Sequence, residues 1–234
     1  MTGSLVSAGT RDRVRGIATP IAKGLGRLGL TPNALTLIGF LGTCVAAFAA
    51  SQQSWLAAGI LVLVFGIFDL FDGTLARATG RATKLGAFLD STFDRAGEAI
   101  VYIGIAAGCL AAGFAFGALL SASAMAAAFM VSYTRAKAES LGFAPGSGMV
   151  NVGLAPREVR MVLLVLGLIA TQYQGGLSVI YDPGFGGYLG GYAPFGTEDG
   201  SGTIALTLAL ITILAMVTTI QRILHVRAQA TREG

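Results

Sequence analysis

The sequence predicts an all-α integral membrane protein with six transmembrane helices and an N-terminal amphipathic helix on the membrane surface. Only 12% of the 234 residues are charged, whereas soluble domains carry about 25% charged residues. The mean hydropathy is +0.72, and several apolar stretches reach the roughly 20 residues that a helix needs to cross a bilayer. We therefore expect one membrane domain over residues 1–234, without a separate soluble domain.

Lys and Arg are absent from three long stretches of the chain, at residues 34–76, 96–134 and 161–221. They gather in five short segments, at residues 11–27, 77–95, 135–137, 157–160 and 222–232. Because basic segments stay on the cytoplasmic side of a membrane, they predict a multi-pass protein of the cytoplasmic membrane with both termini in the cytoplasm. This charge pattern favours contacts with anionic lipids and phosphorylated substrates and argues against nucleic acid.

The elements are expected in the following order. Residues 11–28 carry apolar side chains every three or four positions between Arg and Lys, which predicts the surface helix, although an ordinary juxtamembrane segment would also fit. Six spans then form a bundle over residues 33–226, at residues 33–51, 54–76, 88–112, 114–139, 156–173 and 202–226. Residues 174–201 contain no Lys or Arg, which predicts an external loop. The N-terminus has no short apolar core followed by a cleavage site, so no removable signal peptide is expected.

Four carboxylates lie close together in the sequence at the ends of two of these spans. Asp69 and Asp72 are three residues apart, and Asp90 and Asp94 are four apart, so each pair shares one face of a helix. Unpaired charge beside a bilayer is costly, and clustered carboxylates take up protons unless cations neutralise them. Oxygen ligands in this number suit two Mg²⁺ ions, with Mn²⁺ as an alternative. The segment therefore predicts a divalent metal site at the cytoplasmic membrane surface.

The same segment contains groups that suit a pyrophosphate. Gly73 and Gly86 lack a Cβ and allow close approach to the backbone, and the Arg77 guanidinium can bind phosphate. A purely structural interpretation would make Asp90 a helix cap and Arg77 a cytoplasmic anchor. That interpretation leaves Asp69 and Asp72 at the end of an apolar helix unexplained.

This segment resembles the signature of the CDP-alcohol phosphatidyltransferase family, D-x-x-D-G-x-x-A-R, eight residues, then G-x-x-x-D-x-x-x-D. The fixed positions are Asp69, Asp72, Gly73, Ala76, Arg77, Gly86, Asp90 and Asp94. The resemblance implies a homodimeric enzyme that transfers a phosphatidyl group from a CDP-linked lipid to an alcohol and releases CMP. It implies that the four aspartates hold two divalent ions and that Asp94 is also the base. It further implies contacts with the CDP-linked lipid from Pro32, Asn33, Ala34, Leu35, Gly73, Ala76, Arg77, Thr83 and Gly86.

The acceptor alcohol is expected to carry a phosphate. Arg157 and Arg160 form an R-x-x-R pair, and a pocket for a phosphate dianion is expected from Ser132, Arg135, Arg157, Arg160 and Arg222. These stretches resemble the inositol-phosphate-using branch of the family, although Pro156 precedes the pair here. The resemblance implies transfer from CDP-diacylglycerol, or CDP-archaeol, to inositol 1-phosphate (1D-myo-inositol 3-phosphate), giving phosphatidylinositol phosphate and CMP.

Three other interpretations stay open. The acceptor could be glycerol 3-phosphate, as in phosphatidylglycerol-phosphate synthesis, because it is also anionic. The arginines could be membrane anchors without a substrate role. Acidic residues in membrane spans also occur in divalent-cation transporters, although Arg77 would repel a permeating cation.

Overall fold

The computed structural model describes residues 29–80, 82–143, 152–177 and 199–233, with Pro20, Gly24, Gly26 and Arg27. The side chains of residues 69, 70, 232 and 233 are not described. All regular secondary structure in these ranges is α-helical, which confirms the all-α class. The predicted surface helix at residues 11–28 falls almost wholly outside the described residues, as does most of the predicted external loop.

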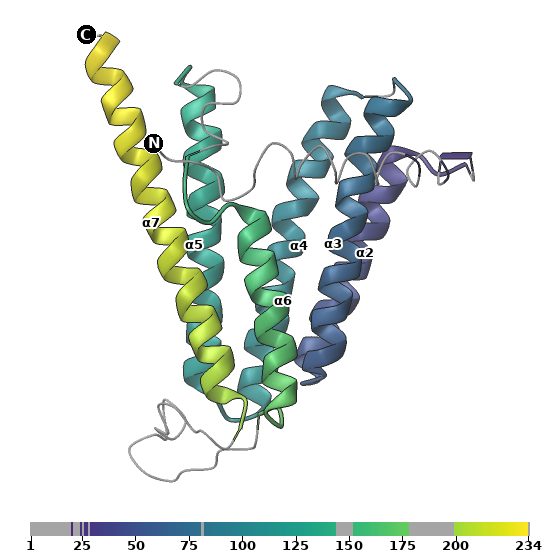
Figure 1. The fold of residues 1–234 in the computed structure, drawn as a ribbon, viewed down its shortest axis with the longest axis vertical. Helices are drawn as coiled ribbons and strands as arrows, with labels where there is room; N and C mark the ends of the chain where they lie inside the picture. The colour runs from purple at the N-terminus through teal and green to yellow at the C-terminus, as the bar shows by residue number, and fades with distance from the viewer. Residues whose placement is uncertain are drawn as a thin grey trace.

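Six long helices follow one another along the described chain (Figure 1): α2 (Pro32–Ser51), α3 (Trp55–Ala78), α4 (Lys84–Ala111), α5 (Ala115–Ser140), α6 (Arg157–Tyr173) and α7 (Ser201–Glu233). Among the described residues, α2, α3, α5 and α7 are long and apolar enough to cross a membrane. The other two helices do not meet this criterion. Helix α4 carries charged residues in its first half, and α6 is short, with 17 residues. Six transmembrane crossings therefore stay a prediction.

Successive helices run in opposite directions, so the starts of α2, α4 and α6 lie at the same end as the ends of α3, α5 and α7 (Figure 1). We call this the motif end, because it holds the aspartate-rich segment. Hydroxyl caps begin two of these helices: Thr31 Oγ1 accepts a hydrogen bond from Ala34 N at 3.2 Å, and Thr83 Oγ1 accepts one from Gly86 N at 2.9 Å. Such caps satisfy backbone donors that a helix start leaves unpaired.

The helices lie closer together at the opposite end and spread apart toward the motif end, where α6 begins deeper than its neighbours (Figure 1). The main packing pairs are α2 with α3 and α4, α5 with α4 and α7, and α6 with α3 and α7. Glycines allow the closest approach: a Cβ on Gly104 would lie 2.2 Å from Ala47 O across the α2–α4 crossing.

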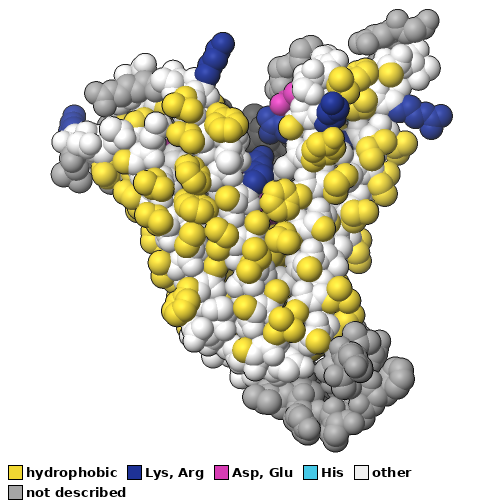
Figure 2. Space-filling model, turned by 180° about the vertical axis from the view of Figure 1, so that it is seen from behind, with side chains coloured by type: hydrophobic (Ala, Val, Ile, Leu, Met, Phe, Trp, Pro, Cys, Tyr) yellow, Lys and Arg dark blue, Asp and Glu magenta, His cyan; other side chains and the backbone are white. Residues whose placement is uncertain are grey.

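The core and the outer surface of the bundle are both apolar. The buried cluster is centred on large side chains such as Trp55, Tyr102, Leu164 and Leu208. Large apolar side chains also cover the outside, and Lys and Arg side chains appear at the motif end and in a notch between the helices (Figure 2). An extensive exposed apolar surface of this kind marks contact with a membrane. Two polar cavities of the described residues lie at the motif end.

Candidate functional site

The first cavity lies between the starts of α2 and α4 and the end of α3. Its volume is about 160 Å³. It is lined by Pro32, Asn33, Thr36, Asp72, Gly73, Ala76, Arg77, Ala82, Thr83, Gly86, Ala87 and Asp90. We call it the α2–α4 cavity. It brings together seven of the nine positions that the family resemblance assigns to the CDP-linked lipid.

The other two positions do not line this cavity. Leu35 is fully buried and packs with Leu75. Ala34 donates its backbone N–H to the Thr31 cap. Both residues help to hold the start of α2 in place, and their contact with the CDP-linked lipid stays a prediction.

The start of α4 is open enough for an anion to approach. A Cβ on Gly86 would lie 3.1 Å from Thr83 Oγ1 and 3.3 Å from Asn33 Oδ1. Glycine at this position therefore lets the Asn33 side chain come close to the helix start. Because the first N–H groups of a helix attract negative charge, the cavity suits a phosphate group, and Arg77 adds a guanidinium to its wall.

Asp72 is held in a fixed orientation inside the α2–α4 cavity. Its side chain is buried, and Thr36 Oγ1 donates a hydrogen bond to Asp72 Oδ2 at 2.6 Å. The backbone N–H of Gly73 donates to Asp72 Oδ1. Thr36 was not among the sequence-based candidates, since its partner lies 36 residues away in the chain.

The second cavity lies deeper in the notch, between α4, α5, α6 and α7. It has a volume of about 300 Å³. It is lined by Asp90, Ser91, Asp94, Arg95, Val131, Ser132, Arg135, Pro156, Arg157, Glu158, Arg160 and Arg222. We call it the arginine pocket. It brings together all five positions expected to bind the acceptor phosphate, from three different helices.

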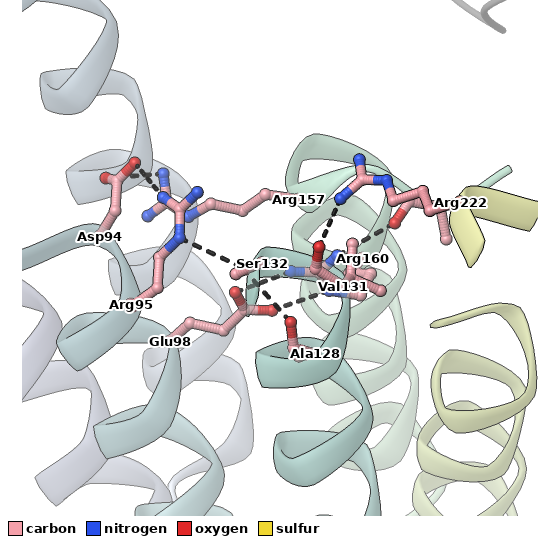
Figure 3. Close-up of polar contacts among 10 residues, drawn as sticks. Asp94, Arg95, Glu98, Ala128, Val131, Ser132, Arg157, Arg160 and Arg222 are labelled. Carbon is pink, nitrogen blue, oxygen red and sulfur yellow. Dashed lines mark hydrogen bonds and ion pairs between the residues drawn. The ribbon is translucent and has the colours of Figure 1, made fainter. Parts of the chain in front are cut away.

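Asp94 stands at the wall of the arginine pocket and faces two guanidinium groups (Figure 3). Arg157 Nη1 lies 2.8 Å from Asp94 Oδ1, and Arg95 Nη1 lies 3.2 Å from Asp94 Oδ2. Arg95 Nε also donates a hydrogen bond to Ser132 Oγ at 3.2 Å. The carboxylate is therefore oriented by residues of α4 and α6 together.

A second acid–base pair lies one helical turn below Asp94 (Figure 3). Arg160 Nε and Nη2 donate to the two carboxylate oxygens of Glu98 at 2.9 and 2.8 Å. Arg160 Nη1 donates to Ala155 O at 3.0 Å. The four-residue spacing of Asp90, Asp94 and Glu98 places all three on one face of α4, and that spacing is the sequence signal that could have identified Glu98.

Arg222 reaches the pocket from α7 and ties two other segments to it (Figure 3). Its Nε donates to Val152 O at 3.1 Å, and its Nη1 donates to Val131 O. Arg135 contacts Glu139 on its own helix, with Arg135 Nε 2.8 Å from Glu139 Oε1. The two arginines thus differ, because Arg222 fixes neighbouring backbone whereas Arg135 is held only by a half-exposed intrahelical pair.

The aspartates fit a divalent cation by donor type. Asp72 and Asp90 line the α2–α4 cavity, and Asp90 and Asp94 line the arginine pocket. Residue 69 is one turn before Asp72 on α3 and so shares its face, although its side chain is not described. Among the described side chains, no three acidic, His or Cys groups come together as a metal cluster. The oxygen donors present are those that Mg²⁺ and Mn²⁺ prefer.

Known proteins resemble this chain over most of its length. The archaetidylinositol phosphate synthase of Pyrococcus horikoshii is 38% identical over 170 residues, which cover 73% of this chain and 86% of that protein. The phosphatidylinositol phosphate synthase of Cutibacterium acnes is 35% identical over 217 residues, which cover 90% and 92%. A crystal structure of Mycobacterium tuberculosis phosphatidylinositol phosphate synthase with CDP-DAG bound superimposes with a TM-score of 0.68 at 25% identity, covering 90% of this chain and 93% of that one.

The family model for CDP-alcohol phosphatidyltransferases matches residues 29–231. This range includes every helix from α2 to α6 and nearly all of α7. It also contains both cavities and the eight signature positions. The chain therefore belongs to the CDP-alcohol phosphatidyltransferase family.

Proposed function

We propose that this protein transfers a phosphatidyl group from CDP-diacylglycerol, or CDP-archaeol, to inositol 1-phosphate, giving phosphatidylinositol phosphate and CMP. The observation that carries this proposal is the position of Asp90, which lines both the α2–α4 cavity and the arginine pocket. The two cavities therefore adjoin at the Asp90 side chain. A nucleotide-linked phosphate in one cavity and an acceptor in the other would therefore come together beside the aspartates.

The CDP-linked lipid is assigned to the α2–α4 cavity. Its pyrophosphate would lie between Arg77 and the N–H groups at the start of α4, where positive charge converges. A third cavity, of about 220 Å³ and mostly apolar, lies between α3, α4 and α6. Half-exposed Leu63, Ile67 and Val162 form part of its wall. An apolar cavity open toward the bilayer suits the lipid chains, and the solved relative with CDP-DAG bound supports this substrate class.

The phosphorylated acceptor is assigned to the arginine pocket. Five guanidinium groups line it, from Arg95, Arg135, Arg157, Arg160 and Arg222. Guanidinium groups bind phosphate dianions in bidentate geometry, and such a pocket would repel a cationic acceptor such as choline or ethanolamine. Relatives that are named phosphatidylinositol phosphate synthase or archaetidylinositol phosphate synthase support inositol phosphate as the acceptor.

In the proposed reaction, Asp94 accepts the proton of the acceptor hydroxyl. The hydroxyl oxygen forms a bond to the lipid-bearing phosphorus, the bond from that phosphorus to the CMP oxygen breaks, and CMP leaves with the electron pair. A carboxylate that guanidinium groups hold in place can receive a proton as the attacking oxygen becomes positive. Arg157 contacts Asp94 in this structure, so it is placed to hold the acceptor phosphate beside the base.

A divalent cation is part of the proposal. Asp69, Asp72, Asp90 and Asp94 would hold two Mg²⁺ ions, or Mn²⁺, and a relative has been crystallised with manganese and citrate. Such ions, when bound, offset the negative charge of the pyrophosphate and of the departing CMP. Thr36 contributes by orienting the Asp72 carboxylate.

The proposal also covers the setting of the reaction. The chain would form one domain and a homodimer in the cytoplasmic membrane, with the motif end and both termini in the cytoplasm. The basic residues at the motif end support this orientation. It would place the site on the side from which phosphorylated acceptors and CDP-linked lipids are supplied.

An acceptor screen tests the function. Purified protein with Mg²⁺ and CDP-diacylglycerol, or CDP-archaeol, is supplied separately with inositol 1-phosphate, glycerol 3-phosphate and inositol, and CMP release is measured. We expect CMP release with inositol 1-phosphate and not with the other two acceptors. Release with glycerol 3-phosphate alone would establish phosphatidylglycerol-phosphate synthesis instead. Uptake of Mg²⁺ into proteoliposomes without CMP release would establish a transporter.

A further inference from the structure

The starting observation is that two acid–base pairs connect α4 and α6 one above the other (Figure 3). Asp94 pairs with Arg157, and Glu98 pairs with Arg160. Both helices run from the motif end into the bundle, and steps of three or four residues each advance by about one turn. The pairs therefore form a ladder whose upper rung is Asp94–Arg157 and whose lower rung is Glu98–Arg160.

The two rungs differ in burial. The side chains of Glu98 and Arg160 are 5% and 1% exposed, whereas those of Asp94 and Arg157 are 18% and 26% exposed. Separating a buried ion pair is energetically costly, because each charge would then lack a partner in an environment of low polarity. The partly exposed upper pair can exchange its partners with substrate. The lower rung is thus fixed, and the upper rung is the one whose residues would contact the substrate.

The lower rung is also connected to the backbone just before α6. Arg160 Nη1 donates to Ala155 O, and Ala155 N donates to Thr218 Oγ1 of α7 at 2.9 Å. Among the described helices, α4 and α6 are not a main packing pair. Helix α6 packs mainly against α3 and α7, so these polar contacts link the α6 start directly to α4.

We propose that Glu98 is a positioning residue of the acceptor pocket, which holds Arg160 and so fixes the first turn of α6 with Arg157 facing Asp94. This inference rests on the proposed function. Glu98 lies outside the eight signature positions, and both of its carboxylate oxygens accept hydrogen bonds from Arg160. Glu98 does not line the arginine pocket and acts on the acceptor through the two arginines. It also borders the apolar cavity assigned to the lipid chains.

The test is the variant Glu98→Gln, which keeps the size of the side chain and removes its charge. A carboxamide accepts with one oxygen and presents an NH₂ to Arg160, so the bidentate pair is lost. We expect the KM for inositol 1-phosphate to rise about tenfold or more, as for loss of a charged hydrogen bond. The KM for CDP-diacylglycerol is expected to change much less, because Glu98 lies outside the α2–α4 cavity and Gln keeps its size where it borders the apolar cavity assigned to the lipid chains.

A control separates positioning from general stability. Ser121 Oγ donates to Tyr102 O at 2.7 Å in a fully buried contact between α5 and α4, and neither residue lines the arginine pocket. Ser121→Ala is expected to lower the melting temperature in detergent without changing either KM. If Glu98→Gln behaves in the same way, with an unchanged KM for the acceptor, the inference is overturned.

A second variant covers the case in which Glu98→Gln does not fold. The variant Glu98→Asp keeps Arg160 and the negative charge but shortens the side chain by one methylene, so the ion pair is retained and its bidentate geometry is lost. A raised KM for the acceptor supports positioning, whereas an unchanged KM overturns it. Failure of the proposed function is seen separately, because the parent protein would then not turn over inositol 1-phosphate. The same comparison would be made with glycerol 3-phosphate if the parent uses that acceptor.

Discussion

The orientation of single side chains at the site depends on partners from other helices. Asp72 is an example, since Thr36 from α2 donates to its Oδ2 and its neighbour Gly73 donates to Oδ1. A ligand carboxylate that is held by such hydrogen bonds does not lose rotational freedom when a cation binds. Loss of a hydrogen-bond partner of a metal ligand typically lowers metal affinity by about 10- to 100-fold.

Thr36→Val tests this role. Valine has nearly the same shape but cannot donate, so Asp72 keeps its place in the cavity and loses one fixed hydrogen bond. The Mg²⁺ concentration for half-maximal CMP release is expected to rise about tenfold, and Mg²⁺ titrations of the purified variant measure it. Thr134→Val is the matched control, because Thr134 Oγ1 donates only to carbonyls of its own helix. An equal shift in both variants would contradict the role given to Thr36.

Among the elements, α4 does most to organise the site. It begins at Lys84, one turn before the predicted residue 88, because the Thr83 hydroxyl caps it. This early start places Gly86 at the first cavity, Asp90 between the cavities and Asp94 in the pocket. Lower down, α4 crosses α2 so closely that a Cβ on Gly108 would lie 2.3 Å from Ala50 O. The second half of α4 is thus held by its packing against α2, and the charged turns of its first half line the notch.

Gly104→Ala tests the close crossing. The added Cβ would lie 2.2 Å from Ala47 O, and since backbone cannot move aside easily, the variant is expected to lose about 1–3 kcal/mol of stability. Thermal unfolding in detergent measures this change. Gly66→Ala on α3 is the comparison, because nothing lies within 4 Å of its Cβ position and its stability should be unchanged or slightly higher. Equal melting temperatures for the two variants would rule out a steric limit at the crossing.

At the scale of the whole molecule, charge and cavities occupy one end and apolar surface covers the rest (Figure 2). Lipid solvates the apolar sides, whereas the carboxylates and guanidinium groups of the notch pair with each other, and the partly exposed ones also reach water. This division lets one molecule offer an apolar cavity to lipid chains and a polar pocket to a water-soluble acceptor.

Orientation in the membrane can be tested with single cysteines in a background with Cys44 and Cys109 replaced by Ala. Leu141 lies at the motif end after α5, and Gln52 lies at the opposite end between α2 and α3; both are exposed. An impermeant thiol reagent added to intact cells is expected to label Gln52→Cys, and to label Leu141→Cys only after permeabilisation. The reverse pattern would place the motif end outside the cell and contradict the positive-inside argument.

The helices could be predicted from the sequence because hydropathy and charge pattern are local properties of the chain. The predicted bounds of the first span, residues 33–51, differ by one residue from those of α2, and residues 156–173 compare with Arg157–Tyr173 for α6. The last helix runs to Glu233, seven residues beyond prediction, since a charged, helix-forming segment can continue past the bilayer. The signature aspartates were visible for the same reason, because helical spacing alone places Asp90 and Asp94 on one face.

Apolar length, charge asymmetry and the aspartate spacing, all readable along the chain, determined that this is a helical membrane protein with an acidic segment at a charged end. Only the tertiary structure decided that Asp90 borders two cavities, that Thr36 orients Asp72, and that Glu98 pairs with Arg160 from 62 residues away. Backbone hydrogen bonding and hydropathy act over one or two helical turns. Pairing between helices depends instead on crossing angles and depths, which arise from the packing of the whole bundle.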